Sequence, residues 1–174
     1  MRARAIGLAT AGVIGLVLVA GPASAATQPE HSVITDLAWF QQNWAVGDVD
    51  CGSFTIHETA VIGRQETKAY FDDSGTVTKV YQHTSFDGRL TNLSTGKTLR
   101  DHVSENSWFP VVNGNFDLVI TSGIDWHLVD AHQGIEVAVN GHLIHDQVTG
   151  EIFFSAGPHD VPSQKIPDLC SLLT

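Results

Sequence analysis

Two titratable residues, Glu58 and His145, stand at positions where the sequence otherwise places apolar side chains. Residues two apart in a β-strand share a face. The residues that share a face with Glu58 are Phe54, Ile56, Ala60 and Ile62, and those that share one with His145 are Val137, Val139 and Leu143. A carboxylate inside an apolar face costs several kcal/mol unless it is paired. Glu58 therefore needs a partner such as His145 or Arg100, or it acts on a ligand.

Such a carboxyl group could act as a general acid or a general base. Burial without a partner raises the pKa of a carboxyl group, so that it can take up and release protons nearer neutral pH. A structural interpretation stays open beside this one. In it, Glu58 lies at a bulge or at the rim of a barrel, and His145 lies at a frayed strand end.

Aromatic residues supply a second set of candidates. Tyr81, Trp108 and Trp126 are of the type that lines pockets for small ligands, although such residues also build plain core. The candidate ligand-binding residues are therefore Glu58, Tyr81, Trp126 and His145. No catalytic residue is assigned.

Known catalytic and metal-binding motifs do not fit the sequence. The chain has nine histidines, yet His142 and His145 are three apart and would face opposite sides of a strand. The zinc-protease motif fails because Val61 follows His57-Glu58 where a second histidine is required. A Gly-x-Ser-x-Gly nucleophile motif does not occur in the sequence either. We therefore predict no metal and no cofactor.

The elements that must position these residues read as β-strands. Gly and Asx turn signals recur about every eight to twelve residues after Cys51, and Val, Ile, Thr, Phe and Tyr dominate between them. The predicted strands are 53–62, 67–72, 76–85, 88–92, 97–106, 115–121, 124–130, 134–145 and 151–156. The sequence predicts an all-β fold, an antiparallel meander closed into an eight- or nine-stranded barrel, because closure removes exposed strand edges.

Two turns and one helix are predicted in more detail. The segments 92–97 and 146–151 share the pattern Asx-x-x-Thr-Gly, in which the Asx side chain caps a hairpin turn and Gly takes a positive φ. Apolar residues recur at helical spacing in 32–45, with Ser32 as a candidate N-cap. We expect a short N-terminal helix or arm within residues 26–50, packed on the barrel domain 51–174.

The two cysteines, Cys51 and Cys170, bracket the strand region. A lone pair in an exported chain predicts a disulfide, and the loop it closes exceeds 100 residues. Two buried free thiols are the alternative. The chain-entropy model gives such a bond roughly 4 to 5 kcal/mol, which is an upper value.

The first 25 residues have the three parts of an export signal. Arg2 and Arg4 precede an apolar run, and Ala23-Ser24-Ala25 forms a cleavage site. An uncleaved membrane anchor is the alternative, but the apolar run of 15 residues is shorter than the roughly 20 that a spanning helix needs. We expect a secreted, extracellular protein that begins at Ala26 and has no membrane span.

Charge excludes one class of partner. The formal net charge of the whole chain is −10, and cleavage removes two cations, which brings it to −12. The seven remaining cations are scattered, so nucleic acid is excluded as a partner, and an anionic membrane surface is disfavoured. The sequence leaves the oligomeric state open.

The segment from Cys51 to Cys170, with its hairpins LTNLSTGK and HDQVTGE and its ending FFSAGPHD, resembles uncharacterised small secreted β-barrel proteins of high-GC Gram-positive bacteria. The resemblance covers about 120 residues. It implies the barrel type of allene oxide cyclase, dirigent and lipocalin-like proteins, which hold small apolar molecules in or at the mouth of the barrel. Catalytic motifs of those families are not matched position by position, and fold alone does not fix function.

Two functions follow as hypotheses. The first is a non-catalytic extracellular barrel that binds a small apolar or amphipathic ligand or a surface component. The second is a barrel enzyme of cyclase or isomerase type that uses Glu58 and His145.

Overall fold

The computed structural model describes residues 28–112, 114–157 and 169–174, with the side chains of residues 125 and 126 outside this description. The predicted export signal lies outside the described residues. The elements are β1 (Glu30–Ile34), α1 (Leu37–Asn43), β2 (Asp48–Asp50), β3 (Thr55–Phe71), β4 (Val77–Asn92), β5 (Thr98–Pro110), β6 (Leu118–Asp130), β7 (Gly134–Asp146), β8 (Ile152–Ala156) and α2 (Leu169–Leu172).

One antiparallel sheet holds all the described strands, which confirms the predicted all-β class. Its order is β1-β3-β4-β5-β6-β7-β8, and β2 also pairs with β3. Because β4 occupies one edge of β3, β1 and β2 lie one after the other along its other edge, with α1 between them. Within the described residues, β8 does not pair with β1, so closure into a barrel stays a prediction.

The strands are longer and fewer than the turn signals indicate. The predicted strands 53–62 and 67–72 are one strand, β3, and 76–85 and 88–92 are one strand, β4. The breaks predicted between 76–85 and 88–92 and between 115–121 and 124–130 are therefore wrong, since Asp87-Gly88 and Ser122-Gly123, whose residue types indicate turns, lie within strands. At Gly123, φ is 128° and a Cβ atom would collide with the Ser104 carbonyl oxygen, which explains the glycine without a turn.

The two patterned hairpins form as predicted. In the turn after β4, Asn92 Oδ1 accepts the backbone N–H groups of Ser94 and Thr95 at 2.8 and 3.1 Å. Asp146 makes the same pair of contacts after β7, to the second and third residues of its turn. Gly96 and Gly150 have φ near 75°. These side-chain caps stabilise the turns that set the register of two hairpins.

The predicted helix is shorter than its apolar spacing indicates. It begins after Asp36, whose carboxylate accepts the N–H groups of Ala38 and Trp39, whereas the predicted cap Ser32 lies in β1. Phe40 is fully buried, and a Cβ atom at Gly63 would collide with its ring. Glycine at position 63 therefore lets α1 lie directly on β3.

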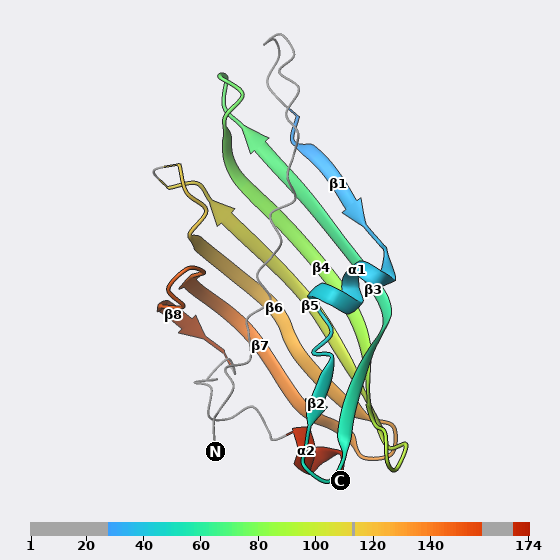
Figure 1. The fold of residues 1–174 in the computed structure, drawn as a ribbon. Coiled ribbons are helices and arrows are strands. Elements are labelled where there is room, and N and C mark those ends of the chain that lie inside the picture. Colours follow the sequence, from blue (N-terminus) through green and yellow to red (C-terminus); the bar gives the residue numbers. More distant parts are fainter. Residues whose placement is uncertain (1–27, 113, 158–168) are drawn as a thin grey trace.

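We call the face of the sheet that carries α1 and α2 the inner face and the opposite one the outer face (Figure 1). Two apolar clusters lie on the inner face. The first gathers Ile56, Leu90, Leu99, Leu128, Val137 and Val139 with Leu173 at the C-terminus. The second gathers Phe40, Ala60, Phe86 and Val103.

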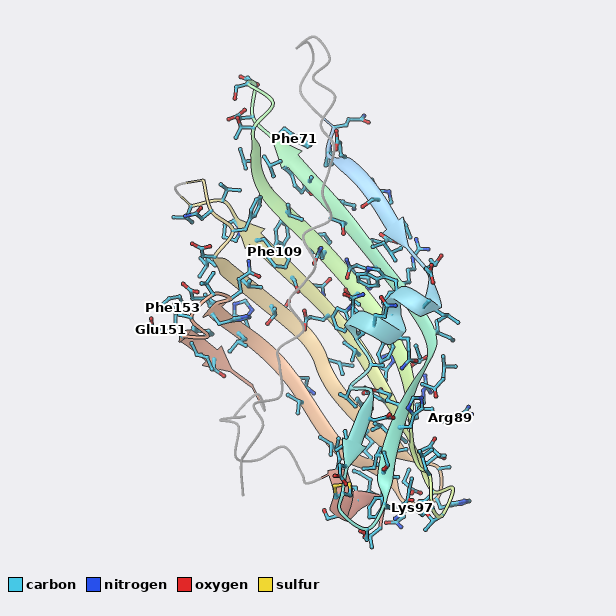
Figure 2. All side chains as sticks on the ribbon, viewed as in Figure 1. Phe71, Arg89, Lys97, Phe109, Glu151 and Phe153 are labelled. Atoms are coloured by element: carbon cyan, nitrogen blue, oxygen red, sulfur yellow. A yellow bond between two sulfur atoms is a disulfide. The ribbon has the colours of Figure 1, made fainter. Side chains whose placement is uncertain are left out.

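The predicted disulfide between Cys51 and Cys170 is present, with a Cα–Cα distance of 5.5 Å. Both cysteines pack against the first apolar cluster. Figure 2 shows the bond beside α2, at the end of the sheet where Lys97 lies and away from Phe71 and Phe109. The bond therefore fixes the C-terminal segment to the start of β3.

Candidate functional site

Glu58 lies on the inner face, as strand alternation predicts, and none of its surface is exposed to solvent. Its side chain passes over Gly88 on β4, where a Cβ atom would collide with its Oε1 atom. Gly88 stands opposite Asp101 on β5 in the strand register. Glycine at position 88 thus leaves room for the Glu58 side chain to extend from β3 across β4 toward β5.

Asp101 is the side-chain hydrogen-bond partner of Glu58. Asp101 is only 4% exposed, so both carboxyl groups are buried. Two carboxyl groups make a hydrogen bond only if one of them carries a proton, and two buried like charges at this range repel strongly. The Glu58–Asp101 contact therefore requires a proton on one of the two carboxyl groups.

Burial raises the pKa of Glu58 above its ordinary value of 4.5. Three smaller effects oppose this. They are the Val46 N–H group, the hydrogen bond with Asp101, and the charge of His57. Burial is the largest of these effects, so the pKa of Glu58 is raised on balance.

Hydrogen bonds from α1 and from the segment between α1 and β2 hold Glu58 and Ala60 in place. Val46 donates its N–H group to Glu58 Oε2 at 2.6 Å. Gln41, on α1, donates from Nε2 to the Glu58 carbonyl oxygen and accepts the Ala60 N–H group at Oε1, each at 2.7 Å. These two backbone groups lie between the stretches of β3 that pair with β1 and β2, so one amide side chain replaces strand pairing there.

Neither partner predicted for Glu58 is its partner in the structure. Arg100 instead contacts both carboxylate oxygens of Asp87, at 2.9 and 3.1 Å. His145 is in register with Val119, in the same row of the sheet as Ala69. Ala69 is eleven positions from Glu58 on β3, roughly 35 Å at the rise of a β-strand. Glu58 and His145 are on the same face but are not brought together.

Two of the aromatic candidates do not face the inner side. Tyr81 and Trp108 are opposite each other on β4 and β5, with ring centroids 4.7 Å apart. Both positions alternate with inner-face positions, which places them on the outer face. The third candidate, Trp126, pairs through its backbone with Val139, and its side chain is outside the described residues.

Sequence reasoning missed a band of hydrogen-bonding residues on the inner face, on the side of Phe86 and Val103 away from Glu58. Gln65, Thr84 and Ser107 are each at most 7% exposed. Thr84 donates to Gln65 Oε1 at 3.3 Å, and Ser107 donates to Glu105 Oε1 at 2.5 Å. The signal was available, because these residues continue the alternation that marked Glu58. We call Gln65, Thr84, Glu105 and Ser107 the polar band.

A small hollow opens beside this band, at the edge formed by β1 and β3. It is lined by Glu30, His31, Ser32, Thr67 and Ala69 and has a volume of about 80 Å³. That is the room of two or three water molecules, well below the roughly 300 Å³ of a complete ligand pocket. The hollow alone is large enough only for one end of a ligand.

The two parts of the inner face differ in what they can do. The Glu58–Asp101 pair can hold and release a proton, but its residues do not line this hollow. They do not line a second hollow either, which has a volume of about 310 Å³ and is lined by Val112, Asn115, Asp117, Leu118, Asp146 and Phe153. The polar band and the hollow beside it combine hydrogen-bonding groups with the apolar residues Ala69 and Val119. In the described ranges, we find no group of three His, Cys, Asp or Glu side chains able to hold a metal ion.

Comparison with known proteins gives no relative for this chain. Family models, curated proteins and solved structures were all searched, and none of them matches. Among the described helices, none is long and apolar enough to cross a membrane.

Proposed function

We propose that the protein binds a small amphipathic molecule on the inner face, beside the polar band. The observation that carries this proposal is the polar band itself. Buried side chains that donate and accept hydrogen bonds lie next to apolar ones, which is the composition of sites for ligands with a polar group on an apolar frame. The hollow at Thr67 and Ala69 supplies room for one end of such a ligand.

The environment of Glu58 fits a binding protein better than it fits an enzyme that uses Glu58. A general acid or base must come within hydrogen-bond reach of its substrate. Glu58 has no exposed surface. Its carboxyl group is hydrogen-bonded to Asp101 and to the Val46 N–H group, and its carbonyl oxygen accepts from Gln41 Nε2. It therefore serves the fold in this proposal, and the polar band serves the ligand.

Secretion is part of the same proposal. The three-part signal in residues 1–25 and the Cys51–Cys170 disulfide both fit an oxidising compartment outside the cytoplasm. N-terminal sequencing of the protein from culture medium is expected to begin at Ala26. A mature chain that retains Arg2 contradicts this part of the proposal.

Ligand binding is tested with the neutral fluorescent probe N-phenyl-1-naphthylamine. Thr67 and Lys68 are neighbours on β3, and only Thr67 lines the hollow. Thr67→Trp should fill the hollow and reduce probe affinity by roughly tenfold or more, while Lys68→Trp, which adds the same ring on the outer face, should bind as the wild type does. Native mass spectrometry of protein from its own culture medium should show a retained ligand. Equal probe affinities in both variants contradict the proposal.

A further inference from the structure

The outer face carries an apolar row that crosses five strands at a single register. Each member stands opposite the next in the strand pairing. The members of this aromatic row are Tyr81, Trp108, Ile120, Ile144 and Phe154. At about 4.8 Å between neighbouring strands, the row is roughly 19 Å long.

A second row runs beside the first, two residues along each strand. Its members also stand opposite one another in register, from β4 to β7. The members of this polar row are His83, Asn106, Ser122 and His142. None of them is an acidic residue, a lysine or an arginine, so the row is rich in hydrogen-bonding groups without fixed charge.

Side-chain contacts join the two rows at both ends. Tyr81 donates its hydroxyl to Asn106 Oδ1 at 2.5 Å, and His83 Nδ1 lies 3.0 Å from the same oxygen. At the other end, the rings of His142 and Phe154 meet edge to face at 5.8 Å. Both contacts of Asn106 use its carbonyl oxygen, so its amide nitrogen is directed away from Tyr81 and His83. The rings and the amide are thus held in fixed positions.

Two members of the aromatic row are exposed within the described structure, Trp108 at 37% and Phe154 at 48%, and the other three are partly buried. Lys79 Nζ lies 5.5 Å from the centroid of the Trp108 ring. Both described helices lie on the other face of the sheet (Figure 1). Apolar surface that is bordered by polar residues is typical of an interaction site.

The chemistry of the rows selects the kind of partner. The chain has a net charge of −10, which repels polyanions. A purely apolar partner would leave the polar row without hydrogen bonds at the interface, which is costly. A partner suited to both rows has apolar patches that stack on rings and neutral hydroxyl groups beside them. Pyranose rings have this arrangement, with C–H faces and equatorial hydroxyls.

We propose that the outer face binds a neutral polysaccharide chain laid across the strands. Sugar ring faces stack on Trp108 and Phe154 at the open part of the aromatic row, and the sugar hydroxyls bond to Asn106 and the other members of the polar row. The inner-face ligand of the proposed function plays no part in this site.

The test is sedimentation of the full secreted protein with microcrystalline cellulose, chitin and starch granules. The wild type should bind at least one of these three neutral polysaccharides. Trp108→Ala should weaken that binding by roughly tenfold, and Trp108→Phe should restore much of it because a ring is kept. Ile135→Ala removes a side chain that is 65% exposed outside both rows and should bind as the wild type does.

Other occupants of the face give other results. If a second copy covers this face, the wild type should be a dimer in analytical ultracentrifugation and the Trp108→Ala variant should be a monomer. A lipid surface would make the wild type bind neutral phosphatidylcholine vesicles and Trp108→Ala lose that binding. Either result, or failure of all three polysaccharides to bind a folded wild type, overturns the proposal. Failure of Thr67→Trp to affect N-phenyl-1-naphthylamine leaves it standing, since that variant probes the inner face alone.

Discussion

Glu58 and Asp101 stand two strands apart and still form a hydrogen bond, because the residue between them on β4 is Gly88. The contact needs a proton, and its surroundings exclude water. This relationship predicts whether several substitutions raise or lower the free energy of unfolding.

The first prediction concerns pH. Burial raises the pKa of Glu58 in the folded protein, so the folded state keeps its proton at pH values where the unfolded chain has lost it. The contribution of Glu58 to stability is therefore greatest below its ordinary pKa of 4.5 and falls as pH rises from there to the raised folded value. Glu58→Gln removes this loss.

Chemical denaturation at pH 4 and pH 8 measures the effect. The variant should match the wild type at pH 4 and exceed it at pH 8 by about 1–3 kcal/mol, the scale on which a buried, poorly compensated polar group costs stability. Glu151→Gln, at an exposed carboxylate, is the control and should show no such difference between the two pH values. A Glu58→Gln variant that is less stable at pH 8 would contradict the shared proton.

The second prediction concerns Gly88. Its alanine variant places a Cβ atom against Glu58 Oε1, and crowding of this kind in a packed interior costs about 1–3 kcal/mol. In a Glu58→Ala background the obstacle is gone, so Gly88→Ala should cost much less. Urea unfolding of the four proteins in this cycle gives the coupling directly. Additive losses would show that Glu58 does not lie over position 88.

The third prediction concerns Gln41, whose side chain satisfies two backbone groups at the edge of β3. Gln41→Leu leaves the Glu58 carbonyl and the Ala60 N–H groups without these partners, and the expected loss is about 2–4 kcal/mol. Gln42→Leu is a matched control, because the neighbouring glutamine of the same helix is exposed. Thermal melts should separate the two variants, and equal melting temperatures would remove the edge role from Gln41.

The fourth prediction concerns the disulfide, whose cysteines are 119 positions apart in sequence. Replacing both cysteines by serine should lower the free energy of unfolding by up to about 4–5 kcal/mol, because the unfolded chain regains the freedom of a long loop. Guanidinium unfolding of the wild type with and without a reductant is the measurement. A free-thiol assay on the denatured, unreduced protein should find none, and two reactive thiols per chain would refute the bond.

Strand alternation predicted the inner position of Glu58 but not its partner. The same alternation places Asp101 between Leu99 and Val103, so the second carboxyl group could have been found from the sequence. What alternation cannot supply is the distance across a strand. That distance depends on Gly88. The dipeptide Asp87-Gly88 is typical of a turn, but here Gly88 lies within β4 and leaves room for the Glu58 side chain.

Register shifts account for other differences. Ile62 was expected to share the face of Glu58, yet it is 58% exposed because β3 shifts register between Ala60 and Ile62. A second shift, in β6 between Ile124 and Trp126, places Leu128 on the inner face while Ile120 is on the outer. A bulge adds one residue without a characteristic sequence pattern, so it changes which residues face the core without a warning in the sequence.

The disulfide has a further consequence for how the protein responds to proteolysis. Cys51 precedes β3 and Cys170 lies in α2, so every hairpin of the sheet from β3 to β8 falls inside the loop they close. A single cut in any of these hairpins leaves two pieces that remain covalently joined. The Asn92 side chain also holds the Leu173 carbonyl oxygen at 2.8 Å, and Leu173 is fully buried. A nicked molecule can therefore keep its fold, and complete loss requires a second cut or reduction of the bond.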